Sequence, residues 1–257
     1  MKENQIHCID VVDGIEKIKS NSIDLIIADP PFNKDKNYGK DYNDKKEIEE
    51  YYNFCEQWIK QGFRVLKDTG SFWIFINSEH LGKLQTLGQK YGLWQNTIVW
   101  HYTNPAPGTK RLPKTWAGWL FFSKTNEFYF NSDCEAVNSY SKHGSEVDKT
   151  RLTDVWNDIS KLTGGYLAQA EVVLKPNSKN RVFVYQLPEK LIERIIRLCS
   201  KTNDLILDIF SHSATTSALS IRSRRNFIAI EQNEYFIKNA KQRLEREKRI
   251  QKMAFKL

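Results

Sequence analysis

The feature that most constrains this chain is a short apolar run at residues 23–28, Ile-Asp-Leu-Ile-Ile-Ala, which ends abruptly at Asp29 and two prolines. Branched aliphatic side chains without regular polar alternation are typical of a strand that is buried on both faces of a parallel sheet. Helices must then cover both faces, so the run predicts an α/β protein.

The rest of the sequence alternates between helical and strand patterns. Apolar side chains recur at three- and four-residue intervals through 47–66 and 79–90, whereas 71–76 and 96–100 are short apolar runs. This alternation predicts βαβ units in one domain spanning 1–257, a doubly wound Rossmann-like sheet. Further elements expected on the same grounds are strands at 119–122, 205–208 and 226–231, and helices that begin at Pro188, Thr215 and Glu234.

Two stretches interrupt the alternation. Residues 104–114 hold three prolines, a glycine and several basic side chains, which indicates a loop. Residues 131–179 are polar and weakly patterned, so we expect mostly irregular structure there. A stretch of that length is uncommon in a compact domain unless it serves a function.

The charge balance favours a partner made of phosphates. The formal net charge is +8, and lysine and arginine gain affinity for nucleic acid by releasing condensed counterions. A lysine-biased proteome explains the same excess equally well. Seven tryptophans and eleven tyrosines tilt the balance toward nucleic acid, because unstacked bases need aromatic surfaces.

Other classes of protein are disfavoured by composition. No apolar run approaches the ~18 residues that cross a bilayer, and the first residues lack a secretory signal, so we expect a cytoplasmic protein without membrane contact. The four cysteines show no paired spacing, so neither a zinc site nor a disulfide framework is expected. The G-x-G-x-x-G pattern of nicotinamide enzymes is also missing.

The turn after the run 23–28 carries the clearest chemistry. In open α/β sheets, ligands bind beyond the carboxyl ends of the strands, where Asp29, Pro30, Pro31 and Phe32 are expected. The exocyclic amine of adenine or cytosine is a poor nucleophile, because its lone pair is delocalised into the ring. A carboxylate and a backbone carbonyl that each accept one N–H would orient that nitrogen toward an electrophile. Phe32 offers a face on which a flipped base stacks, and the prolines stiffen the turn.

On these residues the chain resembles the amino-group DNA methyltransferases, whose catalytic motif is Asp/Asn/Ser-Pro-Pro followed by an aromatic residue. The order of the segments, with the catalytic motif before the cofactor loop, is similar to that of the permuted beta subgroup. Residues 131–179 then occupy the place of its target-recognition region. The resemblance extends over nearly the whole chain, through Asn33, 104–111, 154–156, 191–196, 225–231 and 240–244.

The resemblance implies a methyltransferase sheet with a small recognition insertion and S-adenosylmethionine as cofactor, with no metal. It implies DNA as substrate, most often at adenine N6 for an Asp-Pro-Pro motif. A partner restriction endonuclease and a homodimer or heteromer stay open. Asp10, Asp208, Phe210 and Glu231 would surround the cofactor, although each of these acids also fits a helix cap or solvated turn. Asn33, Lys110, Arg111 and Lys114 would contact DNA.

The chain departs from the family where the cofactor loop is expected. The family pattern is Asp-x-Phe-x-Gly-x-Gly-Thr-Thr. Residues 208–216 match it except that His212 and Ala214 replace the two glycines. Glycine permits positive φ and close approach of a ligand, so His212 either blocks the cofactor or changes the loop path. Segments 116–119 and 183–188 also differ from the family pattern. Two alternatives therefore stay open: a divergent active enzyme, and an inactive subunit that binds DNA or a partner.

Overall fold

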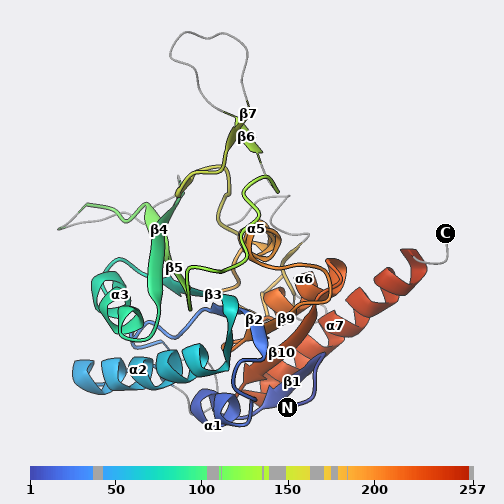
Figure 1. Cartoon of the computed structure of the whole chain (residues 1–257). Coiled ribbons are helices and arrows are strands. Elements are labelled where there is room, and N and C mark those ends of the chain that lie inside the picture. Colours follow the sequence, from blue (N-terminus) through green and yellow to red (C-terminus); the bar gives the residue numbers. More distant parts are fainter. Residues whose placement is uncertain are drawn as a thin grey trace.

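The structure is a computed structural model of the whole chain, and it describes residues 1–36, 43–102, 110, 112–134, 136–138, 149–162, 171–174, 179–183 and 185–254. Within these ranges a mixed sheet of eight strands forms the centre, with helices on both faces (Figure 1). None of the helices described is long and apolar enough to cross a membrane. The strands lie in the order β1 (Gln5–Cys8), β10 (Asn226–Glu231), β9 (Leu205–Asp208), β2 (Ile23–Ala28), β3 (Leu66–Ile76), β5 (Trp116–Ser123), β4 (Leu93–His101) and β8 (Val155–Trp156).

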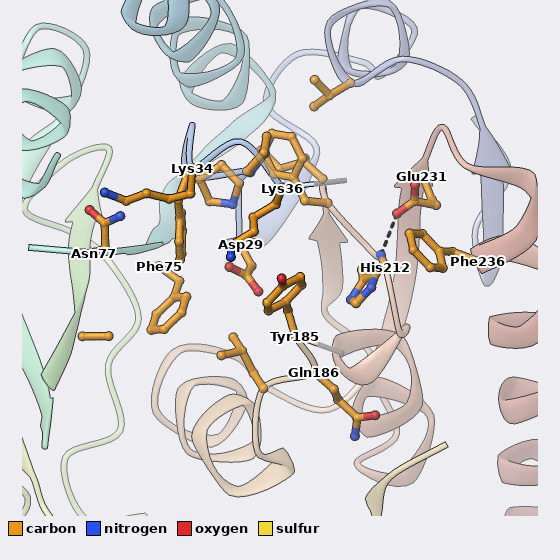
Figure 2. A pocket seen from close by; sticks show the side chains of 18 of the residues that line it. Asp29, Lys34, Lys36, Phe75, Asn77, Tyr185, Gln186, His212, Glu231 and Phe236 are labelled. Carbon is orange, nitrogen blue, oxygen red and sulfur yellow. Dashed lines mark hydrogen bonds between the residues drawn. The ribbon is translucent and has the colours of Figure 1, made fainter. Parts of the chain in front are cut away.

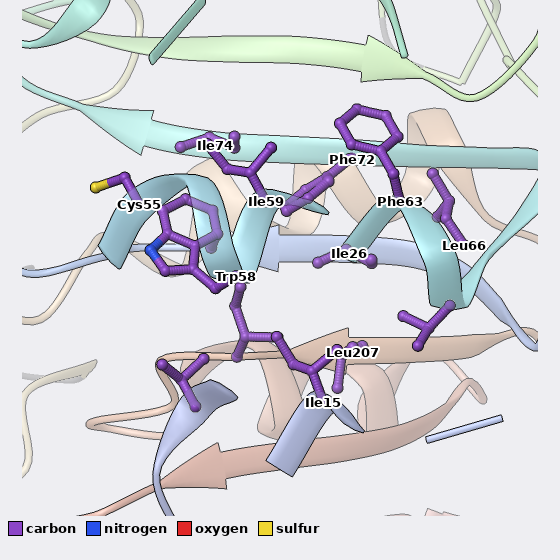
Figure 3. Packing of buried hydrophobic residues seen from close by; sticks show 14 of the residues in the cluster. Ile15, Ile26, Cys55, Trp58, Ile59, Phe63, Leu66, Phe72, Ile74 and Leu207 are labelled. Carbon is purple, nitrogen blue, oxygen red and sulfur yellow. The ribbon is translucent and has the colours of Figure 1, made fainter. Parts of the chain in front are cut away.

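The central strand β2 is buried on both faces, as its apolar run predicts. Ile26 packs into one core with Ile15 and Trp58, and Figure 3 shows these side chains between the sheet and its helices. Leu25 and Ile27 point to the opposite face and pack into a second core. The helices of the first face are α1 (Val11–Glu16), α2 (Ile48–Val65) and α3 (Leu81–Gln89); α5 (Glu189–Cys199), α6 (Thr215–Arg222) and α7 (Glu234–Ala254) cover the other.

The parallel sheet expected from the βαβ alternation is not parallel throughout. Strands β1, β10, β9, β2 and β3 are parallel, whereas β5 runs antiparallel to both of its neighbours, β3 and β4. A parallel connection needs a crossover, usually a helix, and the segment between β4 and β5 has no helical pattern. Strand β5 therefore returns directly beside β4.

The predicted elements agree with the structure in most places. Strands β2, β9 and β10 and helix α6 have the predicted bounds, while β3 begins at Leu66 instead of after Gly70. Strand β1 and helix α1 were not predicted. Within 131–179, strands β6 (Ala136–Asn138) and β7 (Lys149–Arg151) form a separate two-stranded sheet, which stands away from the main sheet in Figure 1.

Candidate active site

A cavity of about 580 Å³ opens at the carboxyl ends of β2, β9 and β10, and its size is typical of small-molecule sites. Figure 2 shows Asp29 near its middle, Phe75 and Asn77 on one side, and Glu231 and Phe236 on the other. We call these sides the β3 end and the β10 end. The predicted residues that line the cavity are Asp10, Asp29, Pro30, Pro31, Phe32, Lys114, Phe210 and Glu231.

Asp29 follows β2 directly, and its carboxyl group is partly buried in the cavity wall. Burial and, to a smaller extent, the charge of the nearby Asp208 together raise the pKa of Asp29 to about 8. Asp208 ends the neighbouring strand β9, where Ile27 is its partner in the sheet. Burial and the charge of Glu231 raise the pKa of Asp208 to about 7, against hydrogen bonds from Thr216 and other donors that lower it. Asp208 lies behind the cavity wall, not on it.

Residues 29–32, which we call the catalytic loop after its expected role, are held by side chains from helix α2 and from the turn before α3. The hydroxyl of Tyr51 donates to the carbonyl of Pro31 at 2.9 Å, and Nε2 of His80 donates to the carbonyl of Phe32 at 3.1 Å. Tyr52 Oη lies 3.1 Å from Nδ1 of His80. Because burial lowers the pKa of His80, the neutral ring carries its hydrogen on Nε2 and accepts from the tyrosine at Nδ1. These two contacts hold the carbonyls of Pro31 and Phe32. They do not hold the carbonyl of Pro30.

Aromatic side chains surround the β3 end. The ring of Phe32 lies 5.8 Å from that of Phe75, and Trp100 and Tyr102 line the same end. The ammonium group of Lys161 lies 3.4 Å from the centre of the Tyr102 ring, close enough for a cation–π contact. Sequence reasoning missed all of these except Phe32, because nothing local to each residue shows that distant strands bring them together.

We call residues 208–216 the cofactor loop, after the role that the resemblance implies. Its backbone has the left-handed conformation that glycines would adopt easily, although the loop contains no glycine. His212 has φ 39° and Ala214 has φ 55°, both in the left-handed region. The ring of His212 is edge-on to Phe183 and Phe236, at 5.0 and 4.6 Å between centroids, and its backbone N–H donates to Glu231 Oε2 at 2.8 Å. Burial lowers the pKa of His212 to about 4, so the ring is neutral near pH 7. His212 forms part of the wall, and the cavity beside it is open.

The other predicted residues have mixed surroundings. Asp10 lines the cavity and also caps α1, because its Oδ1 accepts from Val12 N at 2.8 Å. The side chain of Asn33 is engaged with the backbone of Lys46, in bonds of 3.0 and 2.7 Å. Lys114 reaches the cavity edge, where it pairs with Glu79.

The two remaining predicted DNA contacts lie, like Lys114, in the proline-rich segment. Lys110 is exposed, and Arg111 lies outside the described residues, as do 103–109. The segment 183–188 contributes Tyr185 and Gln186 to the cavity lining. Among the described residues, Gln186 Oε1 is buried without a hydrogen-bond partner, while its Nε2 donates to the carbonyl of Glu171 at 2.8 Å.

Comparisons with known proteins agree with this geometry. The family of DNA methylases matches residues 23–242. The type II methyltransferase M.HinfI from Haemophilus influenzae is 33% identical over 268 residues, which cover 95% of this chain and 70% of that protein. The chain therefore belongs to the N6/N4 DNA methylase family.

Solved structures show the same fold. The cytosine-N4-specific PvuII DNA methyltransferase superposes with a TM-score of 0.70 at 20% identity, covering 96% of this chain and 90% of that one. M1.HpyAVI in complex with S-adenosylmethionine superposes with a TM-score of 0.61 at 21% identity, covering 93% and 98%. The resemblance to amino-group DNA methyltransferases and the Rossmann-like fold expected from it are confirmed.

The β10 end fits this cofactor chemically. Asp10 and Glu231 supply carboxylates, and Phe210 and Phe236 supply apolar walls. Carboxylates at the ends of adjacent parallel strands suit the hydroxyl groups of a ribose. The residues present therefore match a charged nucleoside with both polar and apolar parts.

Proposed function

We propose that this chain transfers a methyl group from S-adenosylmethionine to the exocyclic amine of a DNA base, adenine N6, as part of restriction–modification. One observation carries the proposal: the Asp29 loop opens into the same cavity as Asp10, Phe210 and Glu231. The base would therefore meet the cofactor in one enclosure. When bound, the cofactor supplies an electrophilic methyl group.

The catalytic loop supplies the groups that orient the amine. The carboxylate of Asp29 accepts one amino hydrogen, and the carbonyl of Pro30 accepts the other, so the nitrogen lone pair is directed at the methyl donor. The base stacks on Phe32, with Phe75 behind that ring. Only the ionised form of Asp29 serves this role, which links the reaction to the pKa near 8.

The β10 end would hold the cofactor. Glu231 ends β10, in the place of a ribose-binding acid, while both of its oxygens already accept backbone N–H groups from His212 and Asn233. This fixes the carboxylate in position and leaves lone pairs for ligand hydroxyls. Asp10 would approach the adenine of the cofactor, and Phe210 the methionine part.

DNA would approach across the β3 end. Basic side chains from three separate segments, Lys34, Lys114 and Lys161, line the cavity there. Lysines near a cavity mouth suit phosphates next to a flipped nucleotide. Residues 131–179, with the sheet of β6 and β7, would contact neighbouring bases as the recognition region, with Asn33, Lys110 and Arg111 near the flipped nucleotide. A cognate restriction endonuclease would cleave the unmethylated site.

Adenine is proposed over cytosine because the loop begins with aspartate. The fold itself serves either base, since the PvuII enzyme is cytosine-N4-specific. Mass spectrometry of nucleosides from the DNA of cells that express this chain tests the proposal. We expect N6-methyladenine, which is absent when Asp29→Ala is expressed; N4-methylcytosine would overturn the choice of base.

A second candidate, an inactive subunit that binds DNA or a partner, is favoured by one observation: both family glycines of the cofactor loop are replaced. Isothermal titration calorimetry separates the two functions. We expect heat on adding S-adenosylmethionine in the presence or absence of DNA. Titrations without heat under both conditions would support the inactive subunit.

A further inference from the structure

The cofactor loop contains two left-handed residues that are not glycine. His212 and Ala214 have φ 39° and 55°, on either side of Ser213. A Cβ atom makes this region unfavourable, so such residues persist only where the surroundings determine the backbone. The loop therefore needs external contacts that a glycine-rich loop does not need.

One contact from outside the loop and one within it hold the N–H groups of the left-handed residues. The N–H of His212 donates to Glu231 Oε2 at 2.8 Å, and the N–H of Ala214 donates to the carbonyl of Ser211 at 2.6 Å. The second contact holds one end of the planar peptide unit between Ser213 and Ala214, whose rotation is the φ angle of Ala214. The carbonyl of Ser213, at the other end of this unit, is held by neither contact.

The third contact comes from Arg243 on α7. Its side chain is 7% exposed, and Nη1 donates to the carbonyl of Ser213 at 2.9 Å and to Thr215 Oγ1 at 3.1 Å. Nη2 donates to Glu189 Oε1 at 2.5 Å, which fixes the plane of the guanidinium. The arginine thus bonds the peptide unit that sets φ of Ala214.

Glu189 in turn is shared with a second arginine. Arg222 on α6 pairs with Glu189 and, at 2.7 Å, with Glu247 on α7. No contact of Arg222 with residues 211–215 occurs among the hydrogen bonds of the described residues. The two arginines therefore share one carboxylate, and of the two Arg243 is bonded to the loop.

We propose that Arg243 is a positioning residue, which holds the cofactor loop in the left-handed path that glycines would otherwise allow. The inference rests on the proposed cofactor site at the β10 end. Arg243 does not line the cavity, so it acts through the loop and not by touching the cofactor. By holding the loop, Arg243 keeps the ring of His212 against Phe183 and Phe236. It also keeps the hydrogen bond from the N–H of His212 to Glu231 in place.

The test is calorimetric titration of S-adenosylmethionine into the full chain. Arg243→Lys keeps the charge beside Glu189 but loses the fork that joins it to Ser213. We expect roughly ten-fold weaker binding, the effect of losing a hydrogen bond from a charged donor. The matched control Arg222→Lys changes the same ion-pair network away from the loop and should leave the affinity unchanged.

The decisive comparison adds a glycine. In Arg243→Lys/Ala214→Gly, positive φ no longer carries a steric penalty, so most of the lost affinity should return. A purely structural role of Arg243 would lower the unfolding temperature without such a rescue. If Arg243→Lys alone does not fold, the double variant should still fold and bind.

Several results would overturn the inference. They are an unchanged affinity in a folded Arg243→Lys, an equal loss in Arg222→Lys, no rescue by Ala214→Gly, or a double variant that does not fold when Arg243→Lys does not. If the unmodified chain does not bind S-adenosylmethionine, the proposed function itself fails, and this inference fails with it. The two failures are therefore distinguishable.

Discussion

The two loops that meet at the middle of the cavity keep their shapes by different means. The catalytic loop contains two prolines, and Tyr51 and His80 hold its carbonyls. The cofactor loop, 208–216, contains neither proline nor glycine, yet His212 and Ala214 have positive φ. The conformation of the catalytic loop is therefore favoured by its own residues and by hydrogen bonds. That of the cofactor loop depends on its hydrogen bonds and packing contacts alone.

This contrast orders the expected effects of mutation. Under the proposed function, a change in the catalytic loop removes a group that contacts the substrate in the transition state, whereas a change in the cofactor loop alters a backbone that other contacts also hold. The first kind of change should act on kcat, and the second on cofactor affinity. The predictions below run from the largest effect to the smallest.

Replacing the catalytic carboxylate has the largest effect. Asp29→Ala should lower kcat by roughly 1,000-fold, the loss expected for one preorganised transition-state contact, measured as methyl transfer to DNA. Cofactor binding should persist. The control is Asp68→Ala, which removes an exposed acid of β3 that pairs with Lys124. Full methyl transfer by Asp29→Ala would contradict the mechanism.

The pH profile should show the titration of Asp29 in the free enzyme. Because its pKa is raised to about 8, most carboxyls are protonated at pH 7, and kcat/KM should rise with pH and level off above 8. Well below pH 8 the rise should be about ten-fold per pH unit. A profile that is flat from pH 6 to 9 would show that ionised Asp29 is not required.

The same shift has the opposite sign for stability. In the unfolded chain the carboxyl group of Asp29 has its ordinary pKa near 3.8, so it loses its proton at a lower pH than in the folded chain. The free energy of unfolding should therefore fall as pH rises from about 4 to 8. Denaturant unfolding should show a smaller fall for Asp29→Ala, and an equal fall would indicate an unperturbed carboxyl group.

Weakening the support of the catalytic loop should have an intermediate effect. Tyr51→Phe removes the hydroxyl that bonds the Pro31 carbonyl, and kcat should fall about five-fold, as for one neutral hydrogen bond. The matched control is Tyr91→Phe. It removes a hydroxyl that donates at 2.9 Å to Glu56, which lies on α2 as Tyr51 does. Equal rates in both variants would argue against a role for this contact in positioning the loop.

Restoring one glycine to the cofactor loop should have the smallest effect. His212→Gly relieves positive φ but loses the contacts with Phe183 and Phe236, and these terms are each of order 1 kcal/mol and opposite in sign. Calorimetry should show an affinity for S-adenosylmethionine within about three-fold of the original. A loss or gain beyond ten-fold would mean that one term dominates and that the ring itself decides binding.

The elements predicted well are those whose evidence is local. Strands β2, β9 and β10 are apolar runs between turn residues, and their burial follows from their own composition. Strand β1 escaped prediction because it lies at the sheet edge, with one fully buried residue, Ile6. The direction of β5 was missed because side-chain periodicity is the same in parallel and antiparallel strands.

The site divides in the same way. Asp29 and Phe32 could be placed from the motif, since both follow β2 directly. The contacts that hold the two loops could not be predicted, because Tyr51, His80 and Arg243 are well separated in sequence from their acceptors. Positive φ at Ala214 was also hidden, since alanine does not signal a left-handed backbone.

The row of acids from β2 to β10 also bears on product release. Beyond the effect of burial, Asp208 raises the pKa of Asp29 and Glu231 raises that of Asp208, so the negative charges of these acids disfavour one another. A positively charged ligand relieves this repulsion, and a neutral ligand does not. Under the proposed function, methyl transfer turns a sulfonium into an uncharged thioether. The pocket would then hold its product less tightly than its substrate, which limits inhibition by the product between turnovers.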